Sequence, residues 1–256
     1  MKSLMVALGS LALLIVSSTA LGKPYRPIVV AVIDTGIDSS LMDKSYICKD
    51  ISRDFTGRGL NDVHGHGTHI SGIIHQYVTG AIIPHSPSKV DLERFSKANA
   101  TYCQMILKYY AESAPGSVNL ANMIKALDYA ISMHVDYINI SGGGPESNSQ
   151  EKALIEKALN MGIKVVVAAG NDHHDISFEQ FKYYPASYDK RIIIVGNLSD
   201  NNSRSPSSNY GPKVNTWEHG EGVYSTIPGN KYGRMTGTSQ ATAIKTGKLI
   251  HEVLSH

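Results

Sequence analysis

The chain has 256 residues, which suits one large domain or two small ones. Hydrophobic residues make up 42% and charged residues 18%, so the chain can bury a core, and this composition excludes a largely disordered protein. The formal net charge of +2 gives no electrostatic basis for binding nucleic acid or an anionic membrane. Two cysteines, Cys48 and Cys103, are too few for a multi-cysteine metal site, and the sequence leaves open whether they pair or stay free.

The beginning of the chain has the pattern of an exported protein. Lys2 precedes an apolar run that ends at Val16, and small residues follow as far as Ala20. This pattern is typical of a cleaved secretory signal peptide. The run is shorter than the roughly 20 residues that span a bilayer, although an uncleaved anchor is the alternative. We therefore expect residues 1–20 to be removed and residues 21–256 to be secreted without a membrane attachment.

Short apolar runs along the mature chain predict buried strands. The first covers 28–33, is rich in β-branched residues and ends at a turn, which is typical of a strand buried on both faces of a parallel sheet. Similar runs follow, at 135–140, 163–168 and 191–195, and 102–110 is a further candidate. Helical stripes of apolar residues lie at 120–134 and 151–161. This alternation predicts an α/β fold in three layers, with a mostly parallel sheet covered by helices on both faces.

Two polar segments interrupt this pattern. Residues 84–100 are polar and weakly patterned, and residues 197–215 are rich in Ser, Asn and Pro. We expect both to be surface loops. Neither has the composition of an interdomain linker, so we expect residues 21–256 to form one domain.

Three polar residues follow predicted strands, where the functional residues of parallel sheets gather. They are Asp34, Ser141 and Asn171. Asp34 is open to three interpretations: a turn residue, one of two carboxylates in an aspartic protease, or a carboxylate that orients a histidine. Asn171 is either a turn residue or a donor of an amide hydrogen bond to a developing oxyanion.

A histidine cluster and a serine complete the set of candidates. The segment 64–69 resembles the zinc signature of metallo-β-lactamase-like hydrolases, but Thr68 stands where that signature has Asp. His173 and its neighbours could add ligands, and the alternative is that one histidine of the cluster is a catalytic base. Ser239 precedes a helical pattern, so it is either a helix cap or a nucleophile beside free backbone N–H groups.

Taken together and in this order, the segments resemble the motifs of the subtilisin-like serine proteases. Asp34–Asp38 resembles the Asp motif of that family, His66–Gly72 its His motif and Gly237–Ala241 its Ser motif. Ile138–Pro145 is similar to the family's substrate-binding strand, and Ala168–Asn171 is similar to its oxyanion motif. The resemblance extends over nearly the whole mature chain and implies a subtilisin-like fold.

The resemblance also implies a role for each matching residue. Ser239 would be the nucleophile, His66 the general base, Asp34 the carboxylate that orients His66, and Asn171 an oxyanion donor. Three residues would pair with a polypeptide substrate: Ser141, Gly142 and Gly143. Gly116 and Ser117 would form the opposite wall of that site. We therefore expect a secreted, monomeric serine endopeptidase, and the alternative is an inactive binding module with the same fold.

The sequence departs from the family pattern in several places. Few residues separate Ala20 from the first strand, which leaves no room for the usual propeptide, so a folding helper could act in trans. The segment 74–84 is short where many relatives hold a calcium loop. Although Asp43 matches one calcium ligand, we expect no cofactor. The chain is also shortened after Ser239, so we expect Lys245 and Lys248 to face solvent.

Overall fold

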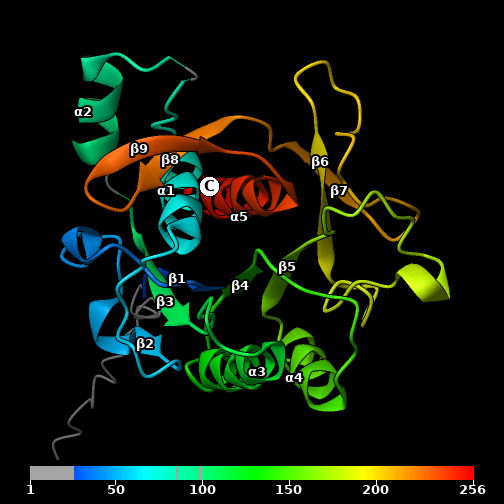
Figure 1. Cartoon of the computed structure of the whole chain (residues 1–256). Helices are drawn as coiled ribbons and strands as arrows, with labels where there is room; N and C mark the ends of the chain where they lie inside the picture. Colours follow the sequence, from blue (N-terminus) through cyan, green and yellow to red (C-terminus); the bar gives the residue numbers. More distant parts are fainter. Residues whose placement is uncertain (1–25, 85, 98–99) are drawn as a thin grey trace, which may run out of the picture.

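A computed structural model describes residues 26–84, 86–97 and 100–256 (Figure 1). The predicted signal peptide, residues 1–20, lies outside the described residues. Within the described part of the chain, no helix is long and apolar enough to cross a membrane.

Seven strands form one parallel sheet, as the apolar runs predict. Their order across the sheet is β2-β3-β1-β4-β5-β6-β7. The strands are β1 (Ile28–Asp34), β2 (Arg53–Asp54), β3 (Tyr102–Lys108), β4 (Tyr137–Ile140), β5 (Lys164–Ala168), β6 (Ile193–Leu198) and β7 (Thr216–His219). All of the predicted strands are present, and β2 and β7 extend the sheet at its two edges. A hairpin of β8 (Val223–Ile227) and β9 (Lys231–Met235) forms a separate antiparallel pair.

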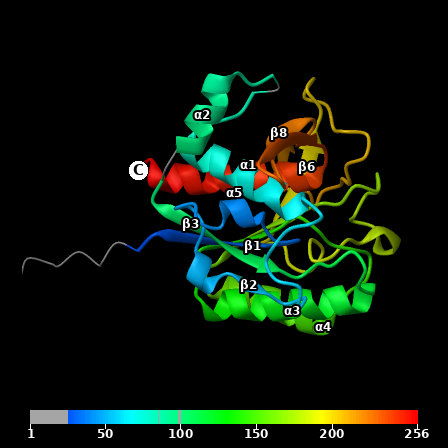
Figure 2. The same ribbon diagram turned by 60° about the vertical axis from the view of Figure 1, so that its left-hand side comes forward.

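Helices cover both faces of this sheet, which confirms the predicted three-layer architecture (Figures 1 and 2). On one face lie α1 (His66–Thr79) and α5 (Thr238–Leu254). On the other lie α3 (Gly116–Ser132) and α4 (Ser149–Asn160). Three short 3-10 helices occur in loops: η1 (Ser39–Leu41), η2 (Lys49–Ile51) and η3 (Glu179–Phe181).

The central strand β1 shows why its sequence is a continuous apolar run. Val30 and Val32 pack into the core beneath α1 and α5, whereas Ala31 and Ile33 pack into the core beneath α3 and α4. Side chains alternate between the faces of a strand, so a strand covered on both sides needs apolar residues at every position.

The prediction that residues 84–100 form a loop is wrong in part, because α2 (Lys89–Lys97) lies within them. This helix is polar overall, and Phe95 supplies its buried contact. The ring of Phe95 lies 5.4 Å from that of His75 and 6.2 Å from that of Tyr232. A single tertiary anchor does not produce a helical stripe in the sequence, so periodicity could not reveal α2.

The two cysteines form a disulfide between Cys48 and Cys103, with their Cα atoms 5.3 Å apart. Cys103 belongs to β3, and Cys48 precedes η2. The Cys48 backbone N–H also donates to the Gln104 carbonyl at 2.9 Å. The disulfide therefore joins the segment before β2 to the body of the sheet, and it resolves the question that the sequence left open.

Candidate active site

The chain order of the strands reverses beside β1, and this point carries two of the candidate residues. β1 pairs with β3 on one side and with β4 on the other, with Ile33 aligned with Ile140. Asp34 and Ser141 come directly after these two aligned residues and therefore lie on neighbouring strands at the same edge. Ligands of open α/β sheets bind at such a switch point, beyond the carboxyl ends of the strands.

Asp34 and His66 form a buried pair at this edge. Nδ1 of His66 lies 2.8 Å from Oδ1 of Asp34, and Asp34 is only 4% exposed. The backbone N–H of Thr35 also donates to Oδ1 of Asp34, at 2.7 Å. His66 is the first residue of α1, so the helix and the end of β1 together fix the orientation of the imidazole.

The Asp34 carboxylate determines the direction in which the pKa of His66 moves. Burial alone would lower this pKa. The charge of Asp34 and its hydrogen bond raise it, and the more distant Asp62 carboxylate adds to this effect, so the pKa of His66 is raised overall. A positively charged imidazole is therefore stabilised at this position.

Asp62 organises the turn that leads into His66, and the sequence analysis missed its role. Asp62 is 1% exposed. Its two oxygens accept hydrogen bonds from Thr35 Oγ1 at 2.9 Å, Gly65 N at 2.8 Å and both N and Oγ1 of Thr68. Burial favours a higher pKa, but these hydrogen bonds outweigh it and lower the pKa of Asp62. The signal in the sequence was an Asx turn, in which Asp is followed three residues later by Gly.

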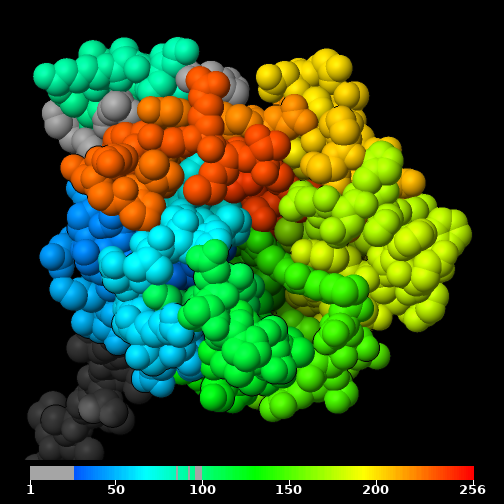
Figure 3. All heavy atoms as spheres, in the orientation of Figure 1, coloured from blue at the N-terminus to red at the C-terminus, as the bar shows by residue number. Residues whose placement is uncertain are grey.

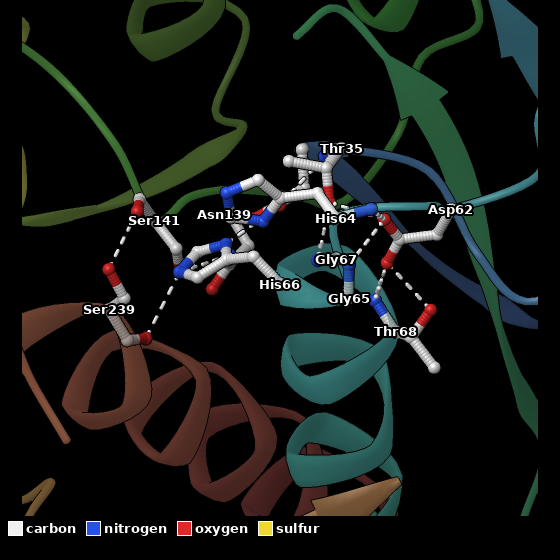
Figure 4. Close-up of polar contacts among 11 residues, drawn as sticks. Thr35, Asp62, His64, Gly65, His66, Gly67, Thr68, Asn139, Ser141 and Ser239 are labelled. Atoms are coloured by element: carbon white, nitrogen blue, oxygen red, sulfur yellow. Dashed lines mark hydrogen bonds and ion pairs between the residues drawn. The ribbon is translucent and has the colours of Figure 1, made fainter. Parts of the chain in front are cut away.

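Ser239 lies in the first turn of α5 and is joined to Ser141 by two hydrogen bonds (Figure 4). Its hydroxyl donates to the Ser141 carbonyl at 2.8 Å, and the Ser141 hydroxyl donates to the Ser239 carbonyl at 3.1 Å. A hydroxyl has one proton, so in this conformation that proton is directed to Ser141 and not to His66. The expected Ser–His contact therefore requires rotation of the Ser239 side chain.

Asn171 lies beyond the end of β5 and is oriented by the residue before Ser239. Its Oδ1 accepts hydrogen bonds from the Thr238 backbone N–H at 2.9 Å and from Thr238 Oγ1 at 3.1 Å. Because Oδ1 is held by Thr238, Nδ2 remains as the donor of this exposed amide. The neighbouring loop is braced by Asn209, whose Nδ2 donates to the Ala169 carbonyl at 2.9 Å.

The predicted substrate segment, Ser141–Gly143, continues into a short antiparallel contact and borders a large cavity. The Gly144 N–H donates to the Tyr184 carbonyl at 3.0 Å, and the Tyr184 N–H donates to the Gly144 carbonyl at 2.7 Å. The cavity beside this segment measures about 540 Å³. Gly116 and Ser117 line it together with Gly143, as the prediction of an opposite wall requires. In Figure 3 the segments at the start of α1, after β4 and at the start of α5 meet near the middle of one face.

The geometry does not favour the two metal or carboxylate alternatives for these residues. Nε2 of His69 points into the protein and lies 3.1 Å from the Val223 carbonyl and 3.2 Å from the Gly233 carbonyl. Among the described residues, no group of three or more His, Cys, Asp or Glu side chains could hold a metal ion. Asp34 pairs with a histidine, whereas an aspartic protease requires a second carboxylate there.

The residues around Asp43 do not fit a calcium ion. Oδ1 of Asp43 forms an exposed ion pair with Lys49, with 2.6 Å between the charged atoms. Calcium needs six to eight oxygen ligands, and a lysine ammonium occupies the side of the carboxylate that would have to bind the ion. We derive no role for calcium in the chemistry below.

The lysines of α5 agree in part with the expectation of solvent exposure. The side chain of Lys248 is 50% exposed, and its Nζ lies 2.6 Å from Oε2 of Glu218. Lys245 is partly buried. The lysine face of α5 is therefore not uniformly open to water, because β7 contributes an acidic partner at its edge.

A parallel α/β sheet with Asp, His and Ser side chains at its switch point defines a hydrolase of the serine class, and comparisons with known proteins agree. Residues 26–250 match the model of the subtilase family. The chain is 32% identical over 235 residues to the major intracellular serine protease of Bacillus subtilis, which covers 90% of this chain and 69% of that protein. It is 33% identical over 219 residues to subtilisin of Bacillus pumilus, covering 83% and 72%.

Other relatives are longer than this chain. Subtilisin amylosacchariticus of Bacillus subtilis subsp. amylosacchariticus is 33% identical over 219 residues, and the match covers 83% of this chain and 52% of that relative. The chain thus spans about half the length of that relative. The crystal structure of a cold adapted subtilisin-like serine proteinase shares the fold, with a TM-score of 0.64, 22% identity and coverage of 87% and 73%.

The chain belongs to the subtilase family, which places it among the serine-type endopeptidases. The fold expected from the resemblance is therefore confirmed.

Proposed function

We propose that this protein is a secreted endopeptidase that hydrolyses peptide bonds with Ser239, His66, Asp34 and Asn171. The observation that carries the proposal is the convergence of four distant segments at one edge of the sheet. Asp34 contacts His66, Ser239 contacts Ser141 on the strand beside Asp34, and Asn171 contacts Thr238.

The nucleophile in this proposal is the hydroxyl of Ser239. It rotates from the Ser141 carbonyl toward Nε2 of His66, which removes its proton as Oγ attacks the substrate carbonyl. The imidazolium then carries a positive charge that the Asp34 carboxylate stabilises through Nδ1–H. The raised pKa of His66 supports this role, because it shows that the protonated ring is favoured beside Asp34.

Two donors are available for the negative charge that develops on the substrate oxygen. One is the Nδ2 group of Asn171, which is left to donate because Thr238 holds Oδ1. The other is the backbone N–H of Ser239, since the first N–H groups of a helix have no partner within the helix. Preorganised donors of this kind supply a large part of the rate enhancement in acyl transfer.

The substrate in this proposal is an extended polypeptide that adds a strand along Ser141–Gly143. The cavity of about 540 Å³ beside Gly143 would take one of its side chains. This cavity is lined largely by aromatic and aliphatic side chains, among them Tyr109, Tyr110, Leu120 and Met123. Such a lining suits an apolar side chain of the peptide.

Export is supported by two independent observations. The amino-terminal sequence has the pattern of a signal peptide, and the chain contains a disulfide between Cys48 and Cys103. Disulfides persist in extracytoplasmic compartments and are rare in the reducing cytosol. One relative is described as intracellular, so the location of this chain needs its own test, which is detection of the mature protein outside the producing cell.

A fluorophosphonate probe tests the proposed chemistry directly, since it reacts only with an activated serine. We expect labelling of the folded wild-type protein at Ser239, and loss of both labelling and peptide cleavage in Ser239→Ala. His66→Ala should also abolish labelling while it leaves Ser239 in place. A folded wild-type protein that is not labelled at Ser239 would refute the proposal and favour the inactive binding module.

A further inference from the structure

An aromatic ring fills the space between two glycine-containing segments of the site. A Cβ atom built on Gly143 would lie 2.7 Å from Cε1 of Tyr183, and one built on Gly170 would lie 2.9 Å from Cε2 of the same ring. Cε1 and Cε2 are opposite edges of a tyrosine ring. The ring of Tyr183 therefore bridges the gap between the two segments, and only glycine at both positions leaves room for it.

This gap lies next to the proposed reaction centre. Gly143 is two residues beyond Ser141, whose carbonyl accepts the Ser239 hydroxyl. Gly170 directly precedes Asn171. A peptide that pairs with the first segment and presents its carbonyl to Ser239 and Asn171 must turn the side chain of that same residue into the gap between the glycines, because successive side chains of a strand point to opposite sides.

The protein holds Tyr183 in this place from both ends of its backbone. Its carbonyl accepts the Ser187 N–H at 2.8 Å, and the following residue, Tyr184, exchanges two hydrogen bonds with Gly144. The ring also packs against the core beneath α3 and α4. Burial, with a smaller contribution from the Asp172 carboxylate, raises the pKa of Tyr183 to about 12, so the ring carries no charge at neutral pH.

We propose that Tyr183 closes the pocket beside the scissile bond, so that the enzyme cleaves after residues with small side chains such as Gly, Ala and Ser. A large side chain at this position would overlap the ring, and displacing the ring would uncover apolar surface. This inference rests on the proposed function. It names a class of substrate for that site and assigns its selection to one side chain.

The test compares peptides that differ only in the residue contributing the scissile carbonyl. For the wild type, we expect kcat/KM with Ala at this position to exceed that with Phe by at least about tenfold, since a misfit of even one methylene changes specificity by roughly 10–200-fold. Tyr183→Ala should open the pocket and move the Ala-to-Phe ratio toward Phe by about tenfold or more. Tyr183→Phe keeps the ring and should keep the wild-type ratio.

Two results would overturn this inference. One is a wild-type library profile in which Phe or Leu at the cleaved position is used as well as Ala, and it requires no variant to fold. The other is an unchanged ratio in a folded Tyr183→Ala protein. If cleavage depends on Ser239 but the ratio does not respond to Tyr183, only the pocket assignment fails. If folded wild type neither cleaves peptides nor labels at Ser239, the proposed function fails, and this inference fails with it.

Discussion

The disulfide allows a quantitative prediction about stability. Cys48 and Cys103 are 55 residues apart, and a cross-link that closes a loop of this length removes conformational entropy from the unfolded chain. The chain-entropy relation gives a stabilisation of about 4 kcal/mol at 25 °C. We therefore expect the double variant Cys48→Ala/Cys103→Ala to lose about 4 kcal/mol in the free energy of unfolding. Its Tm should fall by roughly 10 °C.

Urea unfolding measures this change, and it is best done in a Ser239→Ala background so that self-digestion does not distort the transition. Each single cysteine variant loses the same cross-link and should be destabilised by about as much as the double variant, which makes the singles an internal control. A loss below about 1 kcal/mol in the double variant would contradict the reasoning, because the bond would then not restrict the unfolded chain as its loop length requires.

Two further predictions follow from the histidines of α1. Asp34→Asn should lower kcat/KM by roughly 10⁴-fold, and its residual activity should begin at lower pH. The reason is that burial, once the carboxylate is lost, lowers the pKa of His66; a pH profile shifted to higher pH would contradict this. Burial lowers the pKa of His69 to about 4, so the unfolded chain binds a proton that the native state does not, and stability is lost as pH falls from about 6.5 toward 4. The loss should approach about 3 kcal/mol in urea unfolding, and His69→Gln should flatten it; equal slopes for both proteins would refute this assignment.

Much of the fold could be predicted because its signals are local. A strand such as β1 is apolar at every position, since helices cover both faces of the sheet, and this pattern is visible along a few residues. The polar residues that follow the strands could be assigned to one edge for the same reason. The helix α2 could not be predicted, because the contact of Phe95 with His75 and Tyr232 depends on how distant segments meet.

The candidate site divides along the same line. The motif around His66 identified the histidine, but the hydrogen bonds that Asp62 makes to the turn before it were missed, since the Asx turn was not interpreted as part of the site. The conformation of Ser239 was also beyond the sequence. Whether its hydroxyl donates to Ser141 or to His66 is a choice between rotamers, and only the position of the acceptor decides it.

The sequence by itself determined the layers of the fold, the family and the identity of the polar residues at the carboxyl edge of the sheet. These depend on apolar periodicity and on short motifs, which are properties of neighbouring residues. Only the tertiary structure decided that Cys48 bonds to Cys103 and that Tyr183 lies between Gly143 and Gly170. Both depend on through-space distances between segments far apart in the chain, and such distances are fixed when the core packs.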